Sequence, residues 1–371
     1  MHVNTLFTGV RTFVRFTQSW NFACRLSRDE LVSFFAAGLC SKAVAALSPE
    51  QKENLNALVN TLREKGLIVA PESDREGVRY MAHIMEPLRV IHRPLITYIW
   101  SHYVALLTKV IITMAGFQYR NNGALNYWYR PGKATMDNRE AAEENKPVPF
   151  VFLHGLGMGL APYLHFILQL VTHVTSRRSD LYVLEMPYVA LRLAAEVPSM
   201  DTKAAAIQTV LKRDGYESAN FIGHNFGTLV LARLCKMHPE VVASGTFVDP
   251  ICFLLFLPDV LKNFIYTSPK CARDWTRYLL CSRELYTQHT LCRNFWWYQL
   301  TLFAYEFPPN INVLFSDNDN IIPVAAIKEY LRENQASVKH VEVLQAADHG
   351  QFIANFAWQA AILEQALSEA A

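Results

Sequence analysis

The segment ANFIGHNFGTLVLARLCKM, residues 219–237, decides the fold. Residues 219–222 form a short apolar run that is typical of a buried strand, and residues 227–237 have the apolar periodicity of a helix. Between them, Gly223 and Gly227 flank a three-residue run centred on Asn225. Glycines on both sides permit a sharp turn from strand to helix, because no Cβ obstructs the close approach of the two elements. The segment therefore predicts a tight elbow with Asn225 at its tip.

Strands and helices are predicted to alternate around this elbow, from residue 148 to the last helix. Such alternation is typical of parallel β-α-β units, so we expect an α/β fold with a mostly parallel, doubly wound sheet. Residues 251–310 break the order and are rich in aromatic residues, which predicts a helical lid between two strands. The predicted strands cover residues 125–130, 150–153, 181–184, 219–222, 245–248, 311–315 and 339–344, and the predicted helices cover 163–174, 201–213, 227–237, 324–333 and 353–368.

Three other loops carry polar residues at points where predicted strands end. His154-Gly155-Leu156-Gly157 follows the strand at 150–153, Asp319 lies in SDNDNIIP, and His349 lies in ADHGQF. Ligands of open α/β sheets bind outside the carboxyl ends of the strands. We therefore expect these loops and the elbow to meet in one site.

With these four segments in this order, the sequence resembles the α/β-hydrolase family over residues 120–371. The family is marked by a G-x-S-x-G elbow, a His-Gly-x-Gly oxyanion loop, an acid segment ending in Val/Ile-Pro, and a late His-Gly pair. The matching positions are Gly223 and Gly227, His154 to Gly157, Asp319 to Pro323, and His349 with Gly350. The resemblance implies hydrolysis of a carboxylic ester, a thioester or a lipid-like acyl bond, with no metal and no organic cofactor.

The resemblance also implies a role for each position. Asn225 stands at the nucleophile position, His349 at that of the general base, and Asp319 at that of the acid that orients the histidine. The backbone N–H groups of Leu156 and Phe226 would form the oxyanion hole. The implied substrate-binding residues are His154, Gly155, Gly157, Trp296 and Trp297.

Two other carboxylates are alternatives for the acid. Asp249 follows another predicted strand, in Val248-Asp249-Pro250, where some members of the family place the acid. Asp317 is two residues from Asp319 and could substitute for it. Spacing ranks Asp319 first, Asp249 second and Asp317 third.

Asn225 departs from the family pattern, which has Ser, Cys or Asp at this position. A histidine cannot deprotonate a carboxamide near neutral pH, so activation of an alkoxide is not available here. Asn nevertheless suits an elbow, because it is one of the few residues other than Gly that are enriched at positive φ.

Three hypotheses remain open for the function. The chain could bind acyl or hydrophobic ligands without turnover, or be a hydrolase whose nucleophile has been replaced in this chain. It could also keep the scaffold as a partner-docking or membrane-docking protein. Retention of His349, Asp319 and the oxyanion loop favours the first two hypotheses.

The composition excludes several classes of protein. Of 371 residues, 51% are hydrophobic and 18% are charged, which excludes intrinsic disorder. The formal net charge of +2 provides no basic field, so we expect no nucleic-acid partner. The seven cysteines are odd in number and contain no Cys-x-x-Cys pair, which indicates neither a disulfide framework nor a zinc site and predicts an intracellular setting.

The N-terminal residues have a character of their own. Residues 1–28 contain four Arg but no Asp or Glu, as in organelle transit peptides and in amphipathic surface helices, and we favour the second interpretation. We expect residues 1–120 to form a helical extension, with helices at 29–46 and from Ser48 to Gly66, and residues 121–371 to form the hydrolase domain.

The apolar run at residues 94–117 is long enough to cross a bilayer. Lys109 near its middle would cost about 2.5–3.5 kcal/mol on insertion. His102, Lys109 and Thr113 fall on one helical stripe, which favours a helix mostly buried in protein, or lying in a membrane interface, over a membrane span. The expected partners are therefore a small hydrophobic or acyl ligand and a membrane surface contacted by residues 1–120.

Overall fold

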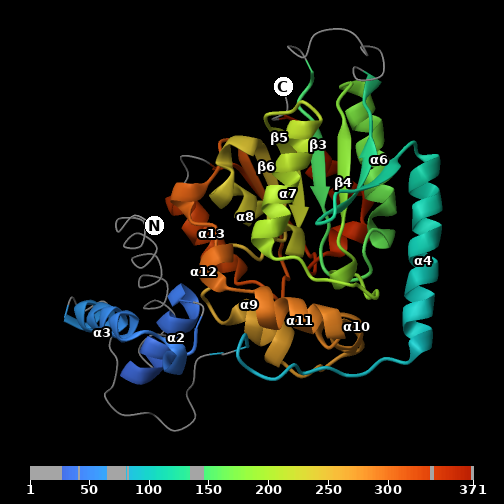
Figure 1. The fold of residues 1–371 in the computed structure, drawn as a ribbon. Helices are drawn as coiled ribbons and strands as arrows, with labels where there is room; N and C mark the ends of the chain where they lie inside the picture. Colours follow the sequence, from blue (N-terminus) through green and yellow to red (C-terminus); the bar gives the residue numbers. More distant parts are fainter. Residues whose placement is uncertain are drawn as a thin grey trace.

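An eight-stranded sheet lies at the centre of the structure, a computed structural model that describes residues 27–40, 42–64, 81, 83–133, 146–334 and 338–368 (Figure 1). The strand order is β1-β2-β4-β3-β5-β6-β7-β8. β2 is antiparallel to both β1 and β4, and all the other pairs are parallel, which confirms the predicted doubly wound sheet. The strands are β1 Gln118–Asn121, β2 Asn126–Arg130, β3 Phe150–Leu153, β4 Leu181–Glu185, β5 Ala219–His224, β6 Val242–Val248, β7 Ile311–Ser316 and β8 Val338–Leu344.

Helices cover both faces of this sheet. Side chains alternate along β3, so that Val151 and Leu153 belong to one buried cluster and Phe150 and Phe152 to the other. The first cluster includes residues of α7, α8 and α13, and the second includes residues of α6 and α14. These helices are α6 Leu164–Ser176, α7 Met200–Arg213, α8 Phe226–Met237, α13 Val324–Glu333 and α14 Phe356–Ser368.

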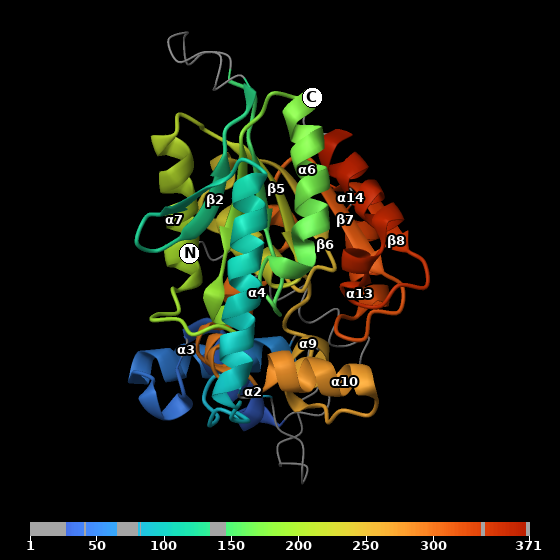
Figure 2. The same ribbon diagram turned by 90° about the vertical axis from the view of Figure 1, so that its right-hand side faces the viewer.

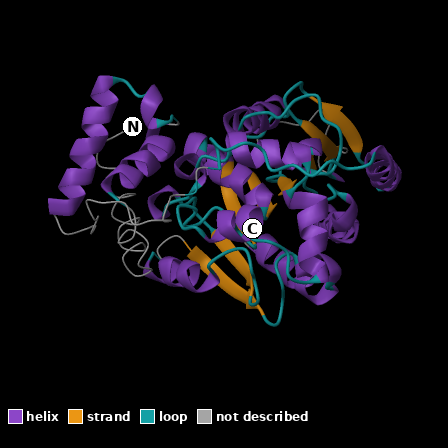
Figure 3. Ribbon diagram, turned by 90° about the horizontal axis from the view of Figure 1, so that it is seen from below, coloured by secondary structure: helices purple, strands orange, loops and turns teal. Residues whose placement is uncertain are grey.

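The predicted helical lid is present between β6 and β7. It lies beneath the carboxyl ends of the parallel strands, next to the N-terminal helices (Figure 1). Seen from below, the helices near the N-terminus form a group to one side of the part that holds the sheet (Figure 3). Its α-helices are α9 Asp259–Leu261, α10 Ala272–Arg277, α11 Leu285–Asn294 and α12 Trp297–Leu300, joined in part by π-helical turns.

Two helices, α2 Arg28–Cys40 and α3 Pro49–Glu64, begin the described part of the N-terminal extension. The predicted helix at 29–46 is wrong at its end. The N–H of Lys42 turns back to the carbonyl of Ala36 (3.4 Å), a bond typical of a helix C-terminus, and this closes α2. The helix predicted after Ser48 is confirmed: Ser48 and Gln51 exchange side-chain-to-N–H bonds of 3.1 Å each, a reciprocal cap. Residues 1–26, with their predicted amphipathic helix, lie outside the described residues.

The segment at 83–94 runs along the lid from the N-terminal helices to α4 Leu95–Met114 (Figure 1). The Arg89 N–H donates to Gln288 Oε1 (3.2 Å), and the Ile91 N–H donates to the Arg283 carbonyl (3.1 Å), so the segment is fixed to the lid. The predicted domain boundary after residue 120 falls inside β1, because that strand already belongs to the sheet.

Helix α4 lies along the outside of the body, in front of β2 and beside α6 (Figure 2). The prediction that it is mostly buried in protein is wrong, since only Ser101, Thr108 and Ile112 are buried. The small hydroxyl side chains face the protein: Ser101 donates to the Leu191 carbonyl, and Thr108 donates within the helix to Val104 (2.8 Å). Most of the larger apolar side chains of α4 are exposed.

Candidate active site

The elbow forms where the sequence places it, between β5 and α8. Asn225 has φ 48° and ψ −113°, a strained conformation, and its N–H donates to the Val248 carbonyl (3.1 Å). A Cβ on Gly227 would lie 2.1 Å from the backbone oxygen of Leu153. Glycine is therefore required there for α8 to pack against β3, which holds the Asn225 side chain at the carboxyl edge of the sheet.

Asn225, His349 and Asp319 form one chain of hydrogen bonds. Asn225 Nδ2 lies 2.6 Å from His349 Nε2, and His349 Nδ1 lies 2.5 Å from Asp319 Oδ2. Asp319 is itself fixed, because its Oδ1 accepts from the N–H groups of Ile321 (2.8 Å) and Ile322 (3.1 Å). An amide donating to Nε2 requires a neutral ring with its proton on Nδ1, which then donates to the carboxylate.

The Asn225 carboxamide also forms a hydrogen bond with the predicted oxyanion loop. Its Oδ1 accepts a hydrogen bond from the Leu156 N–H (3.3 Å). Phe226 is the first residue of α8, so its N–H has no intrahelical partner. The Asn225 side chain thus places its carbonyl oxygen against the Leu156 N–H and its amide nitrogen against the His349 ring.

Buried rings hold the oxyanion loop in place. The Tyr163 hydroxyl accepts from the Gly155 N–H (3.1 Å) and lies 2.7 Å from His224 Nδ1. A Cβ on Gly155 would lie 2.6 Å from that Nδ1, so the loop requires glycine for this approach. His154 Nε2 accepts from the Met186 N–H (3.0 Å), and burial lowers the pKa of His154 to about 4. His154 therefore acts as a neutral support of the loop, away from the site cavity.

The three candidate acids are separated by their contacts. Asp319 contacts His349, whereas the fully buried Asp249 accepts from the Ser316 N–H (2.7 Å) and the Gly350 N–H (2.7 Å). Asp317 is exposed. Asp249 thus ties the loop that carries His349 to the end of β7, and burial raises the pKa of its carboxyl.

Asp249, Asp319 and His349 are also the described residues that could approach a metal ion together. One ligand atom from each lies within 4.8 Å of the others. However, both Asp249 oxygens and both Asp319 oxygens already accept hydrogen bonds from the protein. These three side chains are therefore part of a hydrogen-bonded network in the structure.

The His349–Asp319 pair shifts both pKa values. Burial works to lower the pKa of His349, but the Asp319 carboxylate outweighs it and raises the value above the ordinary 6.5. Burial works to raise the pKa of Asp319, but His349 and two backbone N–H groups bring it below its ordinary value.

Asp319→Asn is therefore expected to lower the pKa of His349, because burial remains when the carboxylate charge is lost. NMR titration of the His349 ring protons measures this. Asp317→Asn, an exposed change two residues away, should leave the titration as it is. An unchanged pKa in Asp319→Asn would contradict the assigned pair.

Two cavities meet at Asn225 and Leu156. The inner pocket, about 340 Å³, is enclosed by apolar side chains and extends under the lid. The outer cleft, about 1250 Å³ with its open mouth, has a polar rim that includes His349 and Arg277. The other residues that define the inner pocket are Ile251, Val260, Leu261, Phe264, Ile265, Leu291, Phe295 and Ile321. An apolar pocket with a few polar groups at one end is the usual form of a small-molecule site.

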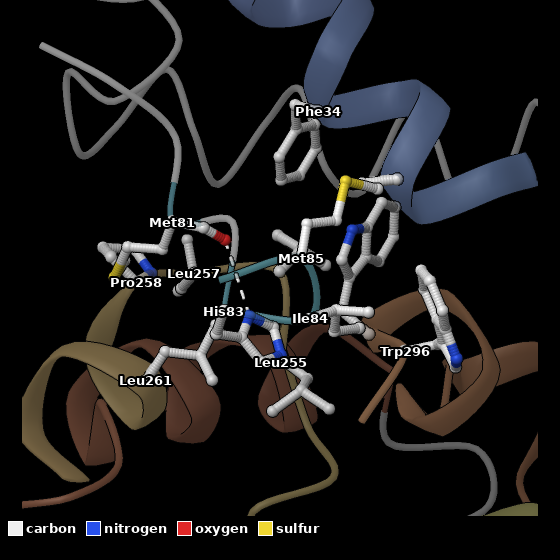
Figure 4. A pocket seen from close by; sticks show the side chains of 13 residues that line it. Phe34, Met81, His83, Ile84, Met85, Leu255, Leu257, Pro258, Leu261 and Trp296 are labelled. Atoms are coloured by element: carbon white, nitrogen blue, oxygen red, sulfur yellow. Dashed lines mark hydrogen bonds between the residues drawn. The ribbon is translucent and has the colours of Figure 1, made fainter. Parts of the chain in front are cut away.

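The structure brings together most of the predicted site residues. Asn225, His349, Asp319 and Leu156 are in contact through hydrogen bonds, and Gly157 lines the outer cleft. Trp296 and Trp297 lie elsewhere, in the wall of a third pocket (Figure 4). The inner-pocket residues of the lid were not predicted from the sequence. An apolar side chain that lines a cavity has the same sequence pattern as one buried in the core.

Comparisons with known proteins give structural matches. No family model matches the sequence, and no curated protein matches it significantly. A putative lipase of Acinetobacter baumannii is similar at 14% identity over 71% of this chain and 94% of that chain, with a TM-score of 0.49. Carboxylesterases of the thaumarchaeon Nitrososphaera gargenis match at 14% identity over 68% and 98%, with a TM-score of 0.45. An epoxide hydrolase of Vigna radiata matches at 14% identity over 68% and 98%, with a TM-score of 0.42. At these identities the function must be argued from the site itself.

Proposed function

This chain has the α/β-hydrolase fold, and on that premise we propose that it binds an acyl or lipid-like ligand beside Asn225 without hydrolysing it. One observation carries the proposal. The Asn225 carboxamide bridges the Leu156 N–H and the His349 ring, and that ring in turn contacts Asp319. The side chain thus occupies the nucleophile position with a group that cannot attack.

The lack of turnover follows from the chemistry of the amide. The Asn225 nitrogen lone pair is delocalised, and His349 cannot remove its proton near neutral pH. The amide oxygen also competes with a substrate carbonyl for the Leu156 N–H. A bound ester therefore meets no activated nucleophile at this position and must compete with Asn225 for the Leu156 N–H.

Ligand binding is supported by the cavities. The inner pocket is apolar and ends at Asn225, and the outer cleft gives access from solvent. This arrangement suits a ligand with an aliphatic part in the inner pocket and a carbonyl group at Asn225. A polar head group of the ligand would lie in the outer cleft, beside Arg273 and Arg277.

Calorimetric titration of the full chain with methyl octanoate tests the proposal. We expect measurable binding, with no hydrolysis above the rate of the His349→Ala variant. Asn225→Gly, which suits the positive φ, should tighten binding about fivefold, because the freed Leu156 N–H gains one hydrogen bond of about 1 kcal/mol. No binding of the ester to either protein, with both folded, would overturn the proposal.

Helix α4 favours a second function, docking on a lipid surface. It is long and apolar enough to cross a membrane by composition, yet its hydroxyl-bearing face is packed along the protein. A helix packed along the protein suits a position in the membrane interface. Its exposed apolar residues are Leu95, Ile96, Ile99, Trp100, Tyr103, Leu106, Leu107, Val110, Ile111 and Met114.

Leu106→Glu with Val110→Glu is expected to weaken binding to phosphatidylcholine–phosphatidylserine vesicles by at least about tenfold, since each apolar side chain contributes about 1.5–3 kcal/mol when buried. Both side chains lie on the side of α4 opposite Thr108. Cosedimentation of the full chain with vesicles measures the effect.

The matched control is Ala205→Glu with Thr209→Glu on α7. These residues are also exposed and four positions apart, so charge and spacing change equally. The control should bind vesicles as the unaltered chain does. Membrane docking would be contradicted if the unaltered chain did not bind vesicles. It would also be contradicted if the chain formed a dimer that the α4 substitutions disrupt.

A further inference from the structure

The inner pocket ends at a residue that it shares with a third pocket. Leu261, at the end of α9, lines the inner pocket on one side and this distal pocket on the other. The neighbouring residues Phe295 and Trp296 line the inner and distal pockets respectively. The two cavities therefore adjoin at Leu261.

The distal pocket, about 540 Å³, is almost entirely apolar (Figure 4). Its walls include Phe34, Met81, Leu257 and Trp296. The one ionisable group among the described lining residues is His83. Its ring nitrogens face the carbonyls of Phe295 (3.2 Å) and Met81 (3.5 Å), and burial lowers its pKa. Such a pocket suits hydrocarbon.

The N-terminal helix α2 forms the far wall of the distal pocket. Phe34 of α2 stacks on Trp297 with ring centroids 5.2 Å apart and planes 11° apart. A Cβ on Gly38 would lie 2.4 Å from the Trp297 ring, so glycine permits this close packing. The extension thus closes a cavity that the lid alone would leave open.

We propose that the ligand carries a long, unbranched aliphatic chain that runs from Asn225 through the inner pocket, past Leu261, into the distal pocket beneath α2. This inference rests on the proposed function, because it places the carbonyl group of the ligand beside Asn225. The inner pocket is the smaller of the two, with about 340 Å³ of empty space against about 540 Å³ in the distal pocket. A short chain fits it, whereas a long chain requires the distal pocket as well.

The path of the chain can be traced by the quenching of tryptophan fluorescence. The full protein is titrated with hexadecanoic acid that carries bromine on its last carbon. We expect strong quenching, because the bromine would lie against Trp296 and Trp297. The same acid with bromine next to its carboxyl group should leave this emission unquenched, and the Trp296→Phe, Trp297→Phe variant should lose the effect of the terminal bromine. Equal quenching by both acids would overturn the proposed path.

A plug at Leu261 provides an independent test. Leu261→Trp should weaken hexadecanoate binding at least about tenfold more than it weakens octanoate binding, because several methylenes of the longer chain lose their apolar surroundings in the distal pocket. Leu285→Trp, an exposed change in the lid, is the matched control. If Leu261→Trp disturbs folding, Leu261→Ala provides the test instead. It should bind hexadecanoate at least as tightly as the unaltered chain does. If octanoate binds but these effects are absent, the proposed role of the distal pocket is contradicted and the proposed function is not. If neither acid binds, the proposed function itself is contradicted.

Discussion

Asn225→Ser is expected to turn the chain into an esterase, with a gain in kcat of up to about 10⁶ over the unaltered protein, the size of the loss when a catalytic serine is removed. The remaining parts are already in place: His349 faces position 225 and Asp319 orients it. The change also frees the Leu156 N–H from the Asn225 amide. Hydrolysis of p-nitrophenyl octanoate measures the gain.

The geometry sets the controls for this variant. A serine Oγ lies one bond nearer the backbone than Asn225 Nδ2, which is 2.6 Å from His349 Nε2, so the serine requires a small movement of the ring. Apo enzymes commonly have such long catalytic hydrogen bonds. Asn225→Gly lacks a nucleophile, and Asn225→Ser with His349→Ala lacks the base, so both should stay at background. A folded Asn225→Ser that hydrolyses no ester would contradict a hydrolase-type site and would favour the docking role.

Much of this site could be predicted from the sequence because strand ends and tight turns have strict requirements. The elbow glycines are needed for α8 to approach β3, and the polar residues follow apolar strands. Such features stand out in a sequence with long buried strands. The meeting of Asn225, Asp319 and His349 follows from the parallel sheet, which gathers the carboxyl ends of its strands at one edge.

Other features have no comparable signal. Strand β1 has the polar sequence Gln-Tyr-Arg-Asn and lies at the edge of the sheet, where no apolar alternation is required. For helix α4, the stripe of His102, Lys109 and Thr113 predicted either burial in protein or a position in a membrane interface. In the structure only three of its residues are buried, and most of its apolar side chains are exposed. The position of Trp296 and Trp297 against α2 depends on packing between segments far apart in the chain. Sequence periodicity contains no information on such contacts.

The second large expected effect concerns which carboxylate, Asp319 or Asp249, acts as the acid that orients His349. In the Asn225→Ser background, Asp319→Asn is expected to lower kcat by about 10⁴, the size of the same exchange in a serine-protease triad. An asparagine can present its NH₂ group to His349 Nδ1, and the ring then places its proton on Nε2, where it cannot accept one from the serine. Rates of p-nitrophenyl octanoate hydrolysis against pH measure the loss.

Asp249→Asn in the same background separates catalysis from support. Its oxygens hold the N–H groups of Ser316 and Gly350, so the amide would place one donor against another in a fully buried site. That conflict should lower the free energy of unfolding by about 1–3 kcal/mol, measured in urea. The loss of kcat should be much smaller than for Asp319→Asn, because Asp249 acts on the His349 loop through Gly350. If Asp249→Asn instead removes the activity while Asp319→Asn retains it, the acid is Asp249, and the His349–Asp319 bond only positions the loop.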